Sequence, residues 1–237
     1  MSLTEVEIGA IIAALSRAGA LAATAPIIGD APVRARLIFV VAIALGVGLN
    51  RPGVAYVDLP MVVLIEVAMG LLTGTTARFA MAGVAVAGQL IGLSLGLGFA
   101  SQYDLHAGES AGTIRMMLTT IASFAFLSVG GLEAIVRSAA ASPNHAVEVA
   151  LLGPELLRQG TSAMTHGLML AGPIVLAALV GNIGLAVMNR AAPAVNVFSI
   201  SLAAVMILGG IVLLATATDL IGGVTGIARD SLAAFSP

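Results

Sequence analysis

Two charged residues lie deep inside apolar stretches of this chain. Arg17 falls within the apolar run 8–28, and Glu66 falls within the run 59–77. A charge at the centre of a hydrocarbon-length helix costs about 2.5–3.5 kcal/mol on insertion scales, so it usually has a partner or faces a wet cavity. The positions of the arginines favour an N-terminus outside the membrane, so that both segments run from outside to inside. Because both residues lie a similar distance from the start of their segments, at ~1.5 Å rise per residue they then reach a similar depth. We predict an Arg17–Glu66 ion pair joining two helices; the alternative is that each charge separately faces water or backbone carbonyls.

Glycine spacing gives a second pattern with physical content. Gly88, Gly92 and Gly96 follow one another at intervals of four in the run 79–100, and Gly70 and Gly74 do so in the run 59–77. Glycines four apart lie on one helix face and let another backbone approach closely. We predict close helix packing at all five; the alternative is chance, because the chain holds 28 glycines.

The signals for enzyme chemistry are weak. Gly92-Leu93-Ser94-Leu95-Gly96 matches the G-x-S-x-G string of serine hydrolases, but that motif needs a strand–turn–helix elbow and here it falls within an apolar helical run. The three histidines, at 106, 145 and 166, lack metal-ligand spacing, and the chain has no cysteine. We expect no catalytic residue, no metal site and no cofactor. An intramembrane serine protease that uses His166 as its base is the enzymatic alternative.

The composition indicates a bilayer protein. Hydrophobic residues make up 59% of the 237 residues and charged residues only 9%, against roughly 25% charged in soluble domains. The absence of a basic cluster argues against a nucleic-acid partner. We predict an all-α polytopic membrane protein of helical hairpins, with six to seven apolar helices in a single domain over 1–237. The apolar segments are 8–28, 37–49, 59–77, 79–100, 116–132, 167–188 and 194–218.

Two of these segments and one connection need comment. The run 37–49 lies between Arg36 and Arg51 and is short for a span, so it is either re-entrant or buried in protein. The connection 101–113 is polar. As a plain sequence it is a solvated linker, and the functional alternative is a cover for a pore. Its polar and flexible residues are Gln102, Tyr103, Asp104, His106, Gly108 and Glu109.

Four strings occur in an order that resembles the FliR/SctT family of flagellar and injectisome type III secretion export-gate components. The first contains Arg17, Pro26, Gly29, Pro32 and Arg34, and the second contains Glu66, Gly70, Gly74 and Phe79. The third runs from Ala87-Gly88-Gln89 to Phe99, and the last contains Asn189, Arg190, Pro193, Asn196 and Phe198. The chain departs from the family pattern at Ala194, at Ser201-Leu202-Ala203 and near Gly130-Gly131.

The resemblance implies a function that composition alone does not. It implies a non-enzymatic subunit that assembles with FliP-like and FliQ-like subunits and an FlhB-like subunit in the bacterial inner membrane, within a flagellar or injectisome basal body. Together these subunits would form a pore for unfolded export substrates across the lipid bilayer. The resemblance also implies that the loop 101–113 is a plug of that pore. A small-solute secondary transporter is the alternative function.

Overall fold

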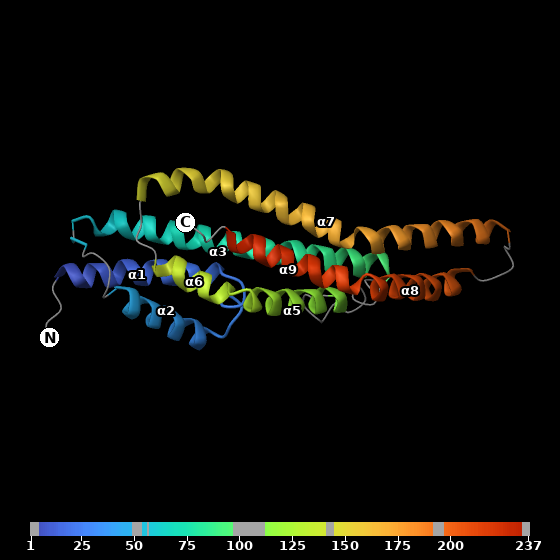
Figure 1. Cartoon of the computed structure of the whole chain (residues 1–237), viewed down its shortest axis with the longest axis horizontal. Coiled ribbons are helices and arrows are strands. Elements are labelled where there is room, and N and C mark those ends of the chain that lie inside the picture. The colour runs from blue at the N-terminus through green and yellow to red at the C-terminus, as the bar shows by residue number, and fades with distance from the viewer. Residues whose placement is uncertain are drawn as a thin grey trace. The chain divides into compact units, whose positions relative to one another are not determined.

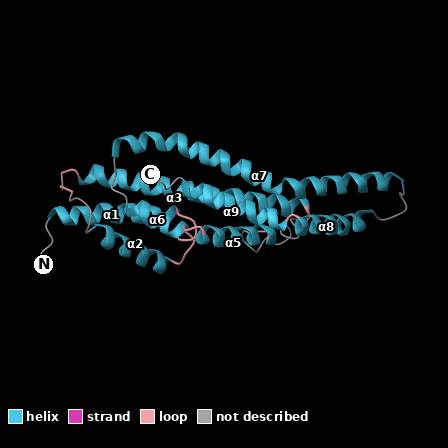
Figure 2. Ribbon diagram, viewed as in Figure 1, coloured by secondary structure: helices cyan, strands magenta, loops and turns pink. Residues whose placement is uncertain are grey.

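The computed structural model describes residues 5–48, 54–55, 57–96, 112–140, 145–191 and 197–233. These residues form helices joined by short turns, and they contain no strand (Figures 1 and 2). The helices are α1 (Glu5–Thr24), α2 (Val33–Gly48), α3 (Leu59–Ser94), α5 (Thr113–Ser128), α6 (Gly131–Ala140), α7 (His145–Ala191), α8 (Val197–Ala215) and α9 (Ala217–Ala233). The predicted all-α class is confirmed.

Three helices of the described chain are long and apolar enough to cross a membrane. They are α1, α3 and the stretch Leu156–Met188 of α7. Two bent pairs raise the count to five if each pair is one span: α5 with α6, bent by 60°, and Ala203–Ala215 with Ala217–Leu232, bent by 62°. A polytopic membrane protein is therefore the fold class that length and composition support.

The predicted separation of 59–77 from 79–100 is wrong. Both runs belong to α3, a continuous helix of 36 residues that is about 54 Å long at the usual rise. Arg78 lies within it and does not end it, because arginine is a good helix former and its long side chain carries the charge away from the helix. The Arg78 guanidinium lies 2.9 Å from the Asp30 carboxylate. The charge of Arg78 interrupts the apolar run of the sequence, but it does not interrupt the helix.

The described chain divides into two compact units. Unit 1 comprises residues 1–81, 126–162 and 228–237, and unit 2 comprises residues 82–125 and 163–227. The helices α3, α5, α7 and α9 each contribute residues to both units. The prediction of one domain over 1–237 stays a prediction.

In unit 1, α1 packs against α2 and α6 (Figure 1). The buried side of α1 is built of small residues, which lets neighbouring backbones come close. A Cβ placed on Gly48 of α2 would lie 2.9 Å from the Cα of Ile11 in α1. The small buried residues of α1 are Gly9, Ala10, Ala13, Ala14, Ala18 and Ala22.

Each bent pair turns at an identifiable residue. Between α5 and α6, Gly130 has a φ of +87°, a left-handed conformation that glycine adopts without steric cost. Its N–H donates to the carbonyl of Leu127 at 3.1 Å, which closes the end of α5. Between α8 and α9 the backbone continues through Thr216, whose N–H donates to the carbonyl of Val212 at 2.9 Å.

Candidate functional site

Arg17 on α1 and Glu66 on α3 meet inside unit 1. The Arg17 Nε and the Glu66 Oε2 are 2.5 Å apart, and the two side chains are 4% and 1% exposed. The structure therefore brings together the two charges that sequence reasoning paired. Their role in function stays a prediction.

A third helix joins this ion pair. The Nη1 of Arg17 donates a hydrogen bond to the carbonyl oxygen of Ser138 at 3.2 Å. Ser138 lies in the last turn of α6, where carbonyls lack partners within the helix and the helix dipole is negative. The guanidinium is thus neutralised by a carboxylate and also closes the end of α6. We name this arrangement of Arg17, Glu66 and the Ser138 carbonyl the arginine tie.

The helical register explains why these two charges are buried. Arg17 falls on the same side of α1 as Ala10, Ala13 and Ala14, all of which are buried. A Cβ on Gly70 of α3, four residues after Glu66, would lie 2.5 Å from the Arg17 carbonyl oxygen. The glycine removes the bulk that would hold α1 and α3 apart, so the helices approach closely where the charges meet.

The arginine tie has a clear energetic consequence. Removing one partner of a buried ion pair costs about 3–5 kcal/mol because the other charge is left uncompensated. A hydrophobic replacement of both partners is often neutral or stabilising. Sequence reasoning missed the Ser138 carbonyl, since a backbone acceptor in α6 carries no residue-type signal.

The glycine predictions divide. Gly70 contacts the backbone of α1, Gly74 contacts Thr24, and Gly88 would place a Cβ 2.6 Å from the Cα of Arg115. Gly92 is buried, but no described heavy atom lies within 4 Å of a Cβ placed on it, so close packing there stays a prediction. Gly92 lies in the last turn of α3, between the buried residues Ile91 and Leu95.

Gly96 has a backbone role that the glycine spacing does not predict. It follows the end of α3 with a φ of +76°, and its N–H donates to the carbonyl of Leu93 at 3.0 Å. That geometry is typical of a glycine that terminates a helix. Gly96 therefore ends α3, and the expectation that it packs against another helix stays a prediction.

The tightest crossing of α3 and α7 in unit 2 lies at glycines that sequence reasoning did not select. A Cβ on Gly167 would lie 2.5 Å from the carbonyl oxygen of Gly83, and one on Gly83 would meet the backbone of Ala163. The signal is present as Ala163-x-x-x-Gly167, a small-xxx-small pair. A single pair of this kind is a weaker pattern than the regular glycine series of 88, 92 and 96.

The first family string forms the turn between α1 and α2. The N–H of Ile28 donates to the carbonyl of Pro26 at 2.7 Å, and the N–H of Gly29 donates to the carbonyl of Ala25 at 2.9 Å. Pro32 directly precedes α2, and Arg34 is exposed in its first turn.

The late string and the polar loop are only partly described. Asn189 and Arg190 lie in the last turn of α7 with Arg190 exposed, and Phe198 lies in α8. Pro193 and Asn196 lie outside the described residues. So do all the predicted plug residues, Gln102, Tyr103, Asp104, His106, Gly108 and Glu109.

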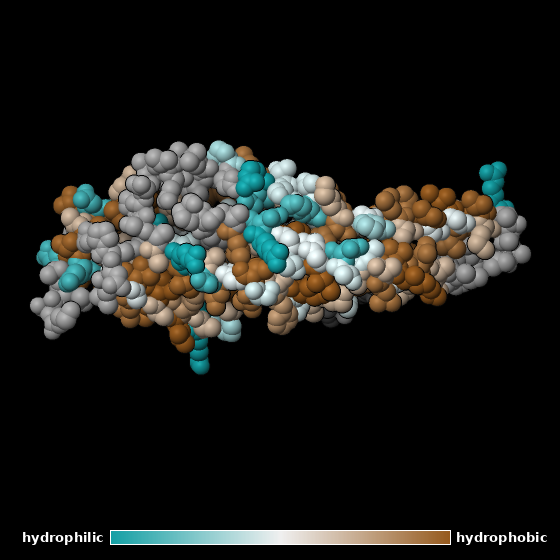
Figure 3. Space-filling view, viewed as in Figure 1, coloured by the Kyte–Doolittle hydropathy of each residue, from teal (hydrophilic) through white to brown (hydrophobic). Residues whose placement is uncertain are grey.

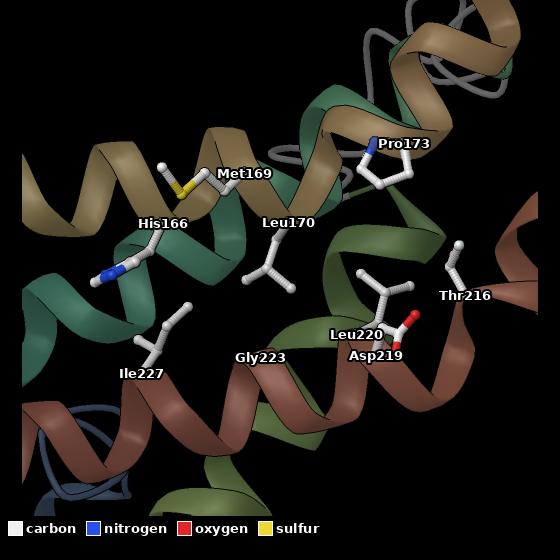
Figure 4. A pocket seen from close by; sticks show the side chains of 9 residues that line it. All are labelled: His166, Met169, Leu170, Pro173, Thr216, Asp219, Leu220, Gly223 and Ile227. Carbon is white, nitrogen blue, oxygen red and sulfur yellow. The ribbon is translucent and has the colours of Figure 1, made fainter.

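A pocket of about 260 Å³ lies in unit 2, and its walls are mostly apolar (Figure 4). His166 lines the end near Ile227, whereas Asp219 lines the end near Thr216, so they face the pocket from opposite ends. Ligand sites usually span roughly 300–1,000 Å³, so this pocket is small. The remaining lining residues are Met169, Leu170, Pro173, Leu220 and Gly223.

The hydrolase-like string has no elbow. Ser94 is the last residue of α3, and its hydroxyl donates to the carbonyl of Ile91 at 2.9 Å. His166 lies on α7 and lines the pocket, whereas Ser94 is not among the pocket residues. The described residues hold no group of three metal-ligating side chains. The buried charges Arg17 and Glu66 form an ion pair that connects two helices, α1 and α3.

Comparison with known proteins gives a consistent result over most of the chain. A family described as "Bacterial export proteins, family 1" matches residues 8–230. The chain is 30% identical over 196 residues to the flagellar biosynthetic protein FliR of Pectobacterium carotovorum subsp. carotovorum, covering 76% of this chain and 73% of that protein. It is 28% identical to FliR of Escherichia coli K12, covering 78% and 76% of the two chains. It is 27% identical to FliR of Caulobacter vibrioides, covering 82% of each.

Proposed function

We propose that this chain, which belongs to the bacterial export proteins of family 1, is a non-enzymatic subunit of the flagellar protein export apparatus. The observation that carries the proposal is the family match over residues 8–230. The relatives that it resembles over about three quarters or more of their length are named flagellar biosynthetic proteins. The three to five candidate spans support a place in a membrane, and we propose the bacterial inner membrane.

Within that apparatus we propose that the chain forms part of the pore that passes unfolded substrates. Its partners would be FliP-like, FliQ-like and FlhB-like subunits. The exposed apolar surface of unit 2 supports this proposal, because other subunits can pack against it. Figure 3 shows apolar side chains over the end of α7 and over α8. The exposed apolar residues there are Leu176, Leu179, Val180, Ile183, Val187, Ile207, Ile211 and Leu214.

A non-enzymatic role fits the chemistry of the described core. Its buried ion pair connects helices, and the pocket in unit 2 is small and mostly apolar. The loop 101–113, whose sequence is rich in glycine and polar residues, would close the resting pore.

Deletion and complementation in the native host test the proposal. A strain that lacks this chain should release no flagellar filament protein into the medium, and the wild-type chain should restore release. A variant lacking residues 103–111 should still assemble but should raise the resting ion conductance of the membrane. Normal filament export without the chain would refute the export role, whereas an unchanged conductance would refute the plug alone.

A further inference from the structure

Helix α2 carries an apolar face that the described structure leaves uncovered. The helix buries only Ile43, Ala44 and Gly48. The exposed residues follow a spacing of three to four, which places them along one side of the helix. They are Val33 at 62%, Leu37 at 59%, Ile38 at 71%, Val41 at 48% and Leu45 at 50% exposure.

The length of α2 is that of a helix that enters a bilayer without comfortably crossing it. Its 16 residues extend about 24 Å, whereas the hydrocarbon core is about 30 Å thick. In the sequence, Arg34 and Arg36 stand at one end of the apolar run and Arg51 follows the other. Short apolar helices with arginines at their ends suit the boundary between headgroups and acyl chains.

The two arginines at the start of α2 differ from other arginines of unit 1. Arg17 pairs with Glu66, Arg78 pairs with Asp30, and Arg137 pairs with Glu133. Within the described chain, Arg34 and Arg36 have no carboxylate partner, and the first turn of α2 holds no acid.

Arg36 has a further unfulfilled requirement. Its Nε is shielded from solvent and has no hydrogen-bond acceptor among the described residues. A shielded guanidinium N–H without an acceptor calls for a missing partner, such as an ion or a water molecule. The start of α2 is therefore a positive surface of the described chain.

We propose that the start of α2 binds the headgroup of an anionic phospholipid and that the acyl chains of this lipid lie along the exposed face of α2. Guanidinium groups bind phosphate through paired, charge-assisted hydrogen bonds. Arg34 precedes Leu37, Ile38 and Val41 by three, four and seven residues, so it lies on the same side of α2 as the apolar face, and one lipid satisfies both chemistries there. Arg36 lies toward a different side of the helix and adds positive charge to its start. A protein helix would fit the apolar face, but it would need its own anion at Arg34 and Arg36. This inference depends on the membrane setting and not on the proposed export role.

The absence of tryptophan from the chain allows a direct test. An Ile38→Trp variant, purified from native membranes with its bound partners and reconstituted in vesicles, carries one tryptophan of this chain on the exposed face. Lipids brominated in their acyl chains quench tryptophan on contact. We expect strong quenching, and stronger quenching by brominated phosphatidylglycerol than by brominated phosphatidylcholine in equal mixtures. A Phe126→Trp variant, placed where the native side chain is 1% exposed, is the control that should escape quenching.

A second set of variants tests the headgroup site. Each arginine near an anionic surface is expected to favour the anionic lipid about fivefold. Arg34→Gln with Arg36→Gln should therefore abolish the preference and leave quenching by both lipids. Arg137→Gln, which removes an exposed arginine already paired with Glu133, should retain it.

Three results would overturn the proposal. Absence of quenching at Ile38→Trp by either lipid would show that a protein covers the face. Equal quenching by both lipids in the chain with Arg34 and Arg36 intact, or a preference that inorganic phosphate abolishes, would show that the arginines do not select an anionic phospholipid.

Discussion

In unit 1 the deepest side chains include an arginine and a glutamate, whereas in unit 2 the deepest side chains are aliphatic. All four buried polar side chains of the described residues, Arg17, Glu66, Thr76 and Ser231, belong to unit 1. The core of unit 2 is built from residues such as Val84, Ile91, Ile174 and Val224. A buried ion pair is stable only when the two charged groups meet in a favourable geometry, so it restricts the arrangement of the helices that carry it. Aliphatic helices carry no such directional requirement, and small residues decide where they approach closely.

This difference indicates how the two units are specified. The arginine tie fixes α1, α3 and α6 to one another through directional contacts. Unit 2 relies on shape at Gly83 and Gly167, and much apolar surface of α7 and α8 stays exposed. Substitutions test this difference between the two units, and we describe them from the largest expected effect on stability to the smallest.

The largest effect is expected from Glu66→Gln. It keeps the shape of the side chain but leaves Arg17 as an uncompensated buried charge, so the free energy of unfolding should fall by about 3–5 kcal/mol. Denaturant unfolding of the purified protein in detergent micelles measures the change. Arg17→Leu combined with Glu66→Leu should recover most of the loss, and a double variant no better than the single one would contradict the arginine tie.

In unit 2 the corresponding change is Gly167→Ala. The added methyl would lie 2.5 Å from the Gly83 carbonyl oxygen, so α3 and α7 must separate. Overpacking of this kind typically costs about 1–3 kcal/mol. Gly172→Ala on the same helix has no described atom within 4 Å and is the matched control, which should be neutral or stabilising. Equal melting temperatures of the two variants would argue against packing by shape in unit 2.

The bend between α5 and α6 gives a smaller effect. Gly130→Ala places a side chain at a φ of +87°, where an ordinary residue is less stable by roughly 1–2 kcal/mol. Asn tolerates the left-handed region better, so Gly130→Asn should cost less than Gly130→Ala. Thermal unfolding compares the two, and the reverse order would mean that the bend does not depend on left-handed backbone at this position.

The smallest effect is expected at Gly92. Gly92→Ala meets no described atom within 4 Å, and alanine favours a helix interior by up to about 1 kcal/mol over glycine. The melting temperature should therefore stay the same or rise. A clear loss of stability, comparable to that of Gly88→Ala, would mean that Gly92 packs against a helix after all.

Sequence reasoning succeeded where one physical requirement had few solutions. Two charges at similar depth in apolar helices have few possible partners, which is why the sequence alone predicts the pairing of Arg17 with Glu66. The predicted boundary between 59–77 and 79–100 is wrong, because a charged residue at this position does not end the helix. Arginine continues a helix well, and the Arg78 side chain pairs with Asp30 outside α3. The Ser138 carbonyl and the contact of Gly83 with Gly167 were also missed, since neither a backbone acceptor nor a partner helix can be read from residue types.

The most direct test of the proposed role in the export apparatus is to purify the tagged chain from native membranes in mild detergent. Mass spectrometry then identifies the proteins that are bound to it. We expect a single large complex that contains FliP-like and FliQ-like subunits. A monodisperse chain that binds no such subunit and instead binds a small solute would contradict the export role and favour a secondary transporter.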